Sequence, residues 1–357
     1  MSVRSGVDSR FTVVLGDDAA LWSEYSPVTY TLRLAVAGTE DVTEITFGLR
    51  SFTADGLTLR INGAPVRLRG EHSGLLFPNS VGCPMSVPEW TDYLSTLKAW
   101  GLNHLRFHTC CPPEAAFAAA DRLGIYMQPE LPFWGTVAAP GEEGFNAAEQ
   151  DFLIAEGLRI QAEYGHHPSF LMMSLGNELW GSPERLDSII ALLRAEDDRH
   201  LFTQGSNNFQ FYPCILPGDD FFSGVRLSYI EIQYGTGVKR VRADITGGLV
   251  PDKPIITHEI GQYCTAPDYG EIGRYSGSLR PRNLLTFKER LEKSGMGELA
   301  ERMHLASGLL AFNCYKLEIE AVMRSRHISG FQLLGLQDFT GQGTALVGML
   351  NALMEEY

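Results

Sequence analysis

The chain has 357 residues, of which 44% are hydrophobic and 20% are charged, and this composition is typical of a folded globular protein and excludes a disordered or membrane-spanning chain. Its 29 basic and 43 acidic residues give a net charge of -14, which repels phosphate groups and excludes general binding to nucleic acids or anionic membranes. The six cysteines lack C-x-x-C spacing and are expected to be reduced, and the first 30 residues lack the apolar segment of a signal peptide, which favours a cytoplasmic protein.

The first part of the chain, residues 1–55, has the pattern of antiparallel strands. Apolar and polar residues alternate in residues 10–16, 28–36 and 42–52, with turn-like breaks between them. Three such strands seldom form a complete sandwich. We therefore expect a partial β unit that either packs on the rest of the chain or belongs to a domain whose beginning is missing.

From residue 56 to residue 357, short apolar strands alternate with helical segments, which is the pattern of βα units. Helical periodicity occurs, for example, in 89–100, 112–124 and 299–324. The predicted strands are 66–74, 103–109, 125–131, 170–178, 201–207, 229–235, 254–261 and 330–339. Eight units predict an α/β fold with a (β/α)₈ TIM barrel, which follows the partial β segment.

Each predicted strand ends in polar or ionisable residues. They are His72, Arg106, His108, Glu130, Asn177, Glu178, Asn207, Tyr234, Glu259, Gln337 and Asp338. The carboxyl ends of barrel strands form the face on which barrel enzymes carry their chemistry. A single glutamate at a strand end is more often a salt-bridge partner, but eight polar strand ends together predict a functional site.

Several segments resemble glycoside hydrolase family 2. They include "SLGNE" (174–178), "KPIITHEIGQY" (253–263) and "LRINGAPVRLRGEHSG" (59–74), together with the stretch 103–135. Residues 9–55 resemble the closing strands of the immunoglobulin-like domain of that family. The resemblance implies a retaining exo-β-glycosidase with a carbohydrate substrate, and it implies no metal or organic cofactor.

The resemblance also implies roles for five residues. Retention requires one carboxylic acid that protonates the leaving oxygen and one carboxylate that attacks the anomeric carbon. Glu178 would be the general acid/base and Glu259 the nucleophile. Asn177 would contact the sugar 2-hydroxyl, Arg106 would keep Glu259 ionised, and Tyr234 would donate a hydrogen bond to the nucleophile.

Further residues are candidates for sugar contacts. Trp134 and Trp180 are possible stacking surfaces for a sugar or packing residues under loops. The histidines His72, His108 and His258 and the carboxylate of Glu130 are candidates for binding sugar hydroxyl groups, since a metal site would require carboxylate or histidine partners that converge on one ion. The last candidates, Gln337 and Asp338, stand where many family members have a tryptophan-containing segment.

The sequence also departs from the family. His108 follows Arg106 by two positions instead of three, and the N-terminal jelly-roll domain of the family is absent, so we expect N- and C-terminal domains to be missing. Three alternatives remain open at this stage: an endo-acting retaining glycanase, a catalytically silent carbohydrate-binding barrel and a metal-dependent barrel hydrolase.

Overall fold

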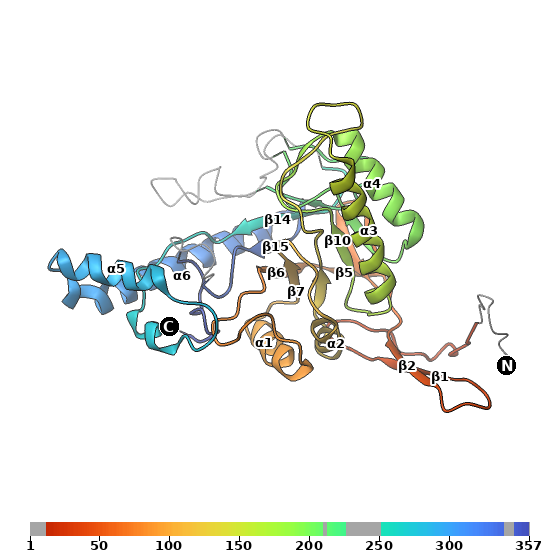
Figure 1. Cartoon of the computed structure of the whole chain (residues 1–357), viewed down its shortest axis with the longest axis horizontal. Helices are drawn as coiled ribbons and strands as arrows, with labels where there is room; N and C mark the ends of the chain where they lie inside the picture. The colour runs from red at the N-terminus through yellow and green to blue at the C-terminus, as the bar shows by residue number, and fades with distance from the viewer. Residues whose placement is uncertain (1–11, 210–212, 226–250, 339–345, 357) are drawn as a thin grey trace.

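A curled parallel sheet forms the centre of the computed structural model, which describes residues 12–209, 213–225, 251–338 and 346–356 (Figure 1). Its strands, in spatial order, are β13 (Phe222–Ser223), β14 (Ile255–Ile260), β15 (Ile328–Leu333), β6 (Leu68–Ser73), β7 (His104–Phe107) and β8 (Tyr126–Gln128). Nearly every residue in these strands is buried, as expected for a parallel sheet that is covered on both faces.

Two further strands continue the parallel pairing. β10 (Met172–Ser174) pairs with β12 (Leu201–Thr203), and isolated parallel bridges join Glu130 to Ser174 and Ser206 to Ser223. Thus β10 and β12 lie between β8 and β13, the two ends of the six-stranded sheet. The predicted strand at 229–235 lies outside the described residues, and β13 pairs with β14 on the side where we expected that strand.

Helices alternate with these strands, which confirms the predicted mixed α/β order. They are α1 (Val87–Ala99), α2 (Glu114–Leu123), α3 (Ala147–Tyr164) and α4 (Pro183–Glu196). The second of them begins after Pro113 and ends at Gly124, whose φ of 72° is a left-handed conformation that glycine adopts without strain. The apolar faces of these helices join the main hydrophobic core against the sheet.

The segment between β14 and β15 contains 3₁₀ turns η2 (Tyr269–Arg274) and η3 (Gly297–Leu299) and helices α5 (Arg282–Lys293) and α6 (Ala300–Arg324). The two helices extend from the body of the molecule (Figure 1). Our prediction missed α5, since only Leu284 of this polar helix is buried. None of the described helices has the length and apolarity needed to cross a membrane.

The N-terminal strands are arranged differently from the prediction. β1 (Tyr30–Ala35) and β2 (Val42–Phe47) form a separate hairpin, while β3 (Phe52–Asp55) pairs with β4 (Thr58–Ile61), which pairs with β5 (Ala64–Val66). Residues 12–16 form no strand, contrary to our expectation, because their apolar side chains are exposed and lack a partner strand among the described residues. The β3–β4 hairpin spans the predicted boundary at residue 55, and the division into domains stays a prediction.

The β3–β5 sheet covers one end of the parallel strands. Trp22, Phe52 and Leu59 share a buried cluster with Tyr126 of β8, and the Trp22 and Tyr126 rings meet edge to face at 5.8 Å. The Trp22 indole N–H also donates a 2.8 Å hydrogen bond to the Asp121 carbonyl. The N-terminal segment therefore packs on the rest of the chain, which was the first of our two expectations for it.

A buried acid on α6 makes stability depend on pH. Burial raises the pKa of Glu318 to about 7, although its carboxylate accepts a 2.8 Å hydrogen bond from the Gly261 N–H. The folded-state pKa exceeds the unfolded value. The contribution of Glu318 to the free energy of unfolding is therefore fully present below pH 4.5 and is lost as pH rises through about 7.

We expect Glu318→Gln to remove that loss. The difference in free energy of unfolding, variant minus wild type, should increase by on the order of 2–3 kcal/mol from pH 5 to pH 8. Urea denaturation of both proteins at the two pH values measures this difference, and other titrating groups cancel in the comparison. A pH-independent difference between the two proteins would contradict the prediction.

Candidate active site

Polar residues from four strands meet at the carboxyl end of the sheet. Arg106 comes from β7, Glu130 follows β8, and Asn177 and Glu178 follow β10, while His258 and Glu259 belong to β14. Parallel strands bring their carboxyl ends to one edge, so residues far apart in the sequence become neighbours. The structure thus joins six of the predicted site residues in one cluster of contacts.

An irregularity in β14 directs two consecutive side chains to this cluster. Successive residues of a regular strand point to opposite faces. In β14 the register with β15 shifts between Thr257 and Ile260, and Glu259 has a φ of 48°, which is left-handed. This local distortion allows His258 and Glu259 to lie together, and such strained backbone is concentrated at functional sites.

Glu178 also has an unusual backbone. Its φ is 50°, and it follows Gly176, whose φ is 147° and where a Cβ atom would come within 2.4 Å of the Phe133 carbonyl oxygen. The amide of Glu178 donates a 2.7 Å hydrogen bond to the Ser206 carbonyl, and the Asn207 side-chain amide donates a 3.3 Å hydrogen bond to its carboxylate. The carboxylate is therefore held by the backbone turn after β10 and by the end of β12.

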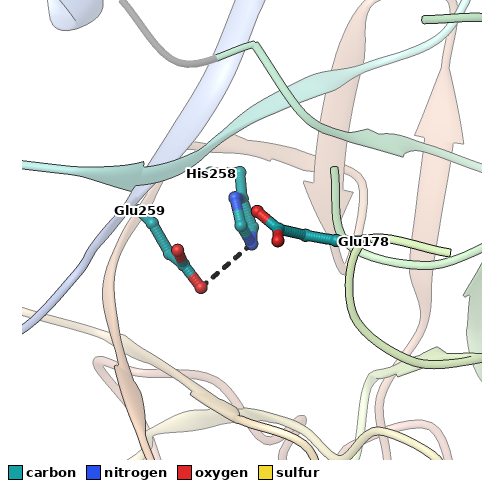
Figure 2. A group of neighbouring side chains, drawn as sticks. All are labelled: Glu178, His258 and Glu259. Carbon is teal, nitrogen blue, oxygen red and sulfur yellow. Dashed lines mark ion pairs between the residues drawn. The ribbon is translucent and has the colours of Figure 1, made fainter. Parts of the chain in front are cut away.

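The side chains of Glu178 and Glu259 approach from opposite sides of the imidazole of His258, which is drawn between them (Figure 2). One oxygen of each carboxylate and one ring nitrogen of His258 all lie within 4.8 Å of one another. Carboxyl groups about 5–5.5 Å apart are typical of retaining glycosidases, whereas inverting enzymes separate them by about 6.5–9.5 Å. The approach of one oxygen from each carboxylate is compatible with the closer of these two spacings.

Arg106 connects the members of the site. Its guanidinium forms a bidentate ion pair with Glu130, at 2.6 and 3.0 Å, and donates a 3.2 Å hydrogen bond to Glu259. It also donates to Asn177 Oδ1 at 2.6 Å and to His108 Nδ1 at 3.3 Å. Because the arginine side chain is fully buried, these contacts replace its hydration and fix the position of its partners.

Glu130 differs from the other two acids of the site. It has no exposed surface, whereas Glu178 and Glu259 keep 8% and 7% of theirs. Besides the pair with Arg106, its carboxylate accepts hydrogen bonds from the hydroxyls of Ser174, at 2.9 Å, and Ser206. These contacts favour a role in holding Arg106 over the predicted contact with a sugar.

The surroundings of Glu259 favour its ionised form. Burial acts to raise its pKa, but the interactions with His258 and Arg106 outweigh burial and hold the pKa well below its usual range. His258 Nε2 lies 3.2 Å from both Glu259 Oε1 and Asn177 Oδ1, so its N–H can donate to both oxygens. Glu259 is therefore a carboxylate, as a nucleophile must be.

Two predicted histidines lie beside this cluster. The rings of His72 and His108 meet edge to face at 5.2 Å, and His108 also contacts Trp134, which is 64% exposed. Burial lowers the pKa of His72 to about 3, and burial followed by the charge of Arg106 lowers that of His108. Both rings are thus neutral near pH 7 and can donate or accept hydrogen bonds.

The remaining predicted residues have different positions. Trp180 lies in the short strand β11 (Trp180–Gly181), which pairs with β9 (Thr136–Val137), and its ring meets Phe209 at 6.1 Å. Gln337 bridges to Leu350, and the amide of Asp338 also donates to the Leu350 carbonyl. Burial, together with the negative charge of Asp338, raises the pKa of Glu271 to about 7. Asp338 therefore lies near Glu271, an acid that the prediction did not include. Tyr234 lies outside the described residues.

The site contains two residues that the prediction left out, Ser174 and Ser206, which bond Glu130. It also contains Asn207, which the prediction named as a polar strand end without a role and which bonds Glu178. Asn207 ends a predicted strand, and that position was the signal that could have identified it. Serines carry no comparable signal, because they are common on strands and in turns alike.

The grouping of Glu178, His258 and Glu259 also raises the question of a metal ion. One imidazole and two carboxylates are suitable ligands. However, the Arg106 guanidinium is 3.2 Å from Glu259 and already supplies a positive charge that would repel a cation. The three side chains therefore have the right ligand atoms for a metal ion, whereas the positive charge of Arg106 beside them opposes its binding.

Known proteins share both sequence and fold with this chain. A protein of Formosa agariphila named "putative β-glucuronidase" is 30% identical over 174 residues, which cover 46% of this chain and 20% of that protein. β-Galactosidase 2 of Enterobacter cloacae is 26% identical over 204 residues, covering 54% and 19%. No protein-family model matches the chain.

A solved structure carries the comparison further. The GH2 β-galacturonidase of Eisenbergiella tayi bound to galacturonate aligns with 96% of this chain and 58% of its own, with a TM-score of 0.64 and 15% identity. The chain is similar to glycoside hydrolases of family 2. The predicted family resemblance is thus confirmed, and the family 2 structure shares the fold. The chain spans about a fifth of the length of the two curated relatives.

Proposed function

We propose that the chain is the catalytic part of a retaining exo-β-glycosidase of family 2. The observation that carries the proposal is the approach of Glu178 and Glu259, each of which brings one carboxylate oxygen to within 4.8 Å of the other. A gap of this size lets one group reach the leaving oxygen while the other reaches the anomeric carbon of the same sugar. The exo mode follows from the family resemblance.

The proposal includes a complete (β/α)₈ barrel over residues 56–357. The bridges from β8 to β10 and from β12 to β13 support closure of the eight strands into one ring. For residues 1–55 we propose part of an immunoglobulin-like unit, for which the β1–β2 hairpin provides two antiparallel strands. Missing domains are consistent with the short coverage of the relatives.

In the first chemical step, the carboxylate of Glu259 attacks the anomeric carbon while Glu178 transfers its proton to the leaving oxygen. The bond to the leaving group breaks, and a covalent glycosyl-enzyme forms. In the second step, Glu178 removes a proton from water, which attacks the anomeric carbon and releases Glu259. Two inversions give overall retention.

The neighbours of the two acids have supporting roles. Asn177 Oδ1 accepts from both Arg106 and His258, so its side-chain N–H groups are the ones directed to a substrate hydroxyl. Arg106 keeps Glu259 ionised in the free enzyme. His72, His108, Trp180 and Tyr234 are proposed sugar contacts, whereas Glu130 is proposed to position Arg106.

The variant Glu178→Gln tests the proposal through the leaving group. With methyl β-glycosides, whose leaving group needs a proton, we expect the rate to fall by about 10²–10⁴-fold. With 4-nitrophenyl β-glycosides the first step needs little acid assistance, so the glycosyl-enzyme should accumulate and give a burst of nitrophenol. A panel of glucuronide, galacturonide, galactoside and glucoside substrates covers the sugars of the relatives.

Glu196→Gln, which changes an exposed acid at the end of α4, is the matched control and should behave as the wild type. An equal loss for both leaving groups would reject Glu178 as the acid. Sugar binding without turnover would favour the silent carbohydrate-binding barrel. Release of internal fragments from a polysaccharide would favour the endo-acting glycanase. Inactivation by EDTA would favour the metal-dependent hydrolase.

A further inference from the structure

A pocket lies at the carboxyl ends of β6 and β15, and we call it the rim pocket. Its volume is about 450 Å³, within the size range of small-molecule sites. The loop after β6, helix α1 and residues 352–354 form its walls. Among the described residues, its lining shares only Gln337 with the predicted site, so it is separate from the carboxylate pair.

Hydrogen bonds fix the walls of the rim pocket. The Pro78 carbonyl accepts a 3.0 Å hydrogen bond from the Gly277 N–H, and the Pro84 carbonyl accepts from the Trp90 indole at 2.9 Å. At the back, the Tyr93 hydroxyl donates a 3.0 Å hydrogen bond to the buried Glu71 carboxylate. The C-terminal wall is held by Asn351, whose side-chain oxygen accepts from the Leu353 N–H. The pocket is therefore preformed.

The lining combines an aromatic surface with donors and acceptors. Phe77 is partly buried, and its ring is supported edge to face by Trp90 and Tyr93, each at 5.7 Å. Asn79 and Gln337 can donate and accept hydrogen bonds, and Thr96 can accept, since its hydroxyl already donates to the Asp92 carbonyl. The Gln337 Oε1 atom is buried and has no hydrogen-bond partner among the described residues. A donor on a bound ligand would satisfy this oxygen, as would a water molecule.

The charge of the lining selects among ligands that have this chemistry. Two lining residues, Glu89 and Asp92, are acidic, and none of the lining residues in the described part of the chain is basic. Carboxylates accept from sugar hydroxyl groups but repel another carboxylate. The lining is therefore complementary to a neutral polyhydroxylated ring and not to a uronic acid.

We propose that the rim pocket is a second carbohydrate site, which binds a neutral sugar next to the catalytic centre. The choice of a sugar as the ligand class rests on the proposed function, but the position and the charge selection of the pocket do not. A substrate with more than one sugar unit would then be held at two places on the same face of the sheet.

The test uses calorimetry on the full chain with the Glu259→Gln change, so that no substrate is consumed. The probes are methyl β-glucoside, methyl β-galactoside and methyl β-glucuronide. The pocket variant is Asn79→Ala with Asp92→Ala, since both residues are exposed and neither belongs to the catalytic centre. Its matched control is Glu143→Ala with Asp151→Ala, two exposed residues elsewhere on the surface.

We expect a neutral glycoside to bind the chain, and we expect the pocket variant to raise its Kd by about fivefold or more, because two hydrogen bonds are lost. The control should not change that Kd, and the glucuronide should bind the pocket more weakly than the neutral sugars. Thermal unfolding of each variant verifies folding. If the chain proves inactive on all glycosides but the pocket variant still weakens sugar binding, the second site stands without the proposed catalysis.

Two results would overturn the inference. One is an unchanged Kd for every neutral sugar in the pocket variant, which would assign all binding to the catalytic centre. The other is a glucuronide that binds as tightly as the neutral sugars and loses affinity in the pocket variant, which would contradict the charge selection.

Discussion

Replacing Glu259 by glutamine should reduce hydrolysis of every substrate by at least about 10⁴-fold, because the amide cannot form the glycosyl-enzyme. The substitution keeps the shape of the side chain and an oxygen that can accept from Arg106, now 3.2 Å away. Steady-state rates with good and poor leaving groups measure the loss. Unlike Glu178→Gln, this variant should show no burst, since the first step itself is blocked.

The matched control is Glu71→Gln, which changes another buried acid. Burial raises the pKa of Glu71 to about 7, so a neutral amide resembles the protonated form that this site already favours, and activity should be nearly retained. Equal thermal unfolding of the two variants would separate lost chemistry from lost structure. Substantial turnover by the Glu259 variant would remove it as the nucleophile.

A second measurement distinguishes the nucleophile from a merely structural acid. In a Glu259→Gly variant, azide can enter the space left by the carboxylate and attack the anomeric carbon directly. A single displacement on an activated β-glycoside would give the α-glycosyl azide, detectable by NMR. The β-glycosyl azide as the product would instead imply that a glycosyl-enzyme still forms and that another residue is the nucleophile.

The sequence was sufficient to predict which polar strand ends lie together, for a physical reason. Apolar strands that finish in polar residues, such as 170–178 and 254–261, are visible without knowledge of the fold, and parallel pairing then brings those ends together. The sixth strand stays untested, because the predicted stretch 229–235 lies outside the described residues. β13 has only two residues, Phe222–Ser223, which give no detectable alternation, whereas 229–235 alternates clearly.

Local distortions and specific partners could not be predicted from the sequence. A regular strand would point His258 and Glu259 to opposite faces, and only the register shift in β14 explains why both belong to the site. Similarly, the sequence suggested that Arg106 pairs with a carboxylate, but two acids from different strands qualify. The structure has Arg106 bonded to both, with the bidentate contact to Glu130.

The Arg106–Glu130 pair should therefore dominate the stability of the site. Both side chains have no exposed surface, so replacing Arg106 by methionine leaves a buried carboxylate without its counter-charge, at an expected cost of about 3–5 kcal/mol. Replacing both residues by methionine should cost less than the sum of the single changes, with a coupling on the order of 2 kcal/mol in urea denaturation. The half-exposed pair of Arg60 and Asp55 provides the control, and Arg60→Met should stay within about 1 kcal/mol.

The milder change Glu130→Gln separates positioning from sugar binding. Since Glu130 is buried behind Arg106, its loss should disturb the position of Arg106 and hence of Glu259, so kcat should fall while KM changes little. A raised KM with an unchanged kcat would instead support the contact with a sugar that the sequence predicted. Aspartate at the same position keeps the charge but shortens the side chain by one methylene, and partial recovery of kcat in Glu130→Asp would show that the negative charge beside Arg106 matters as well as the geometry.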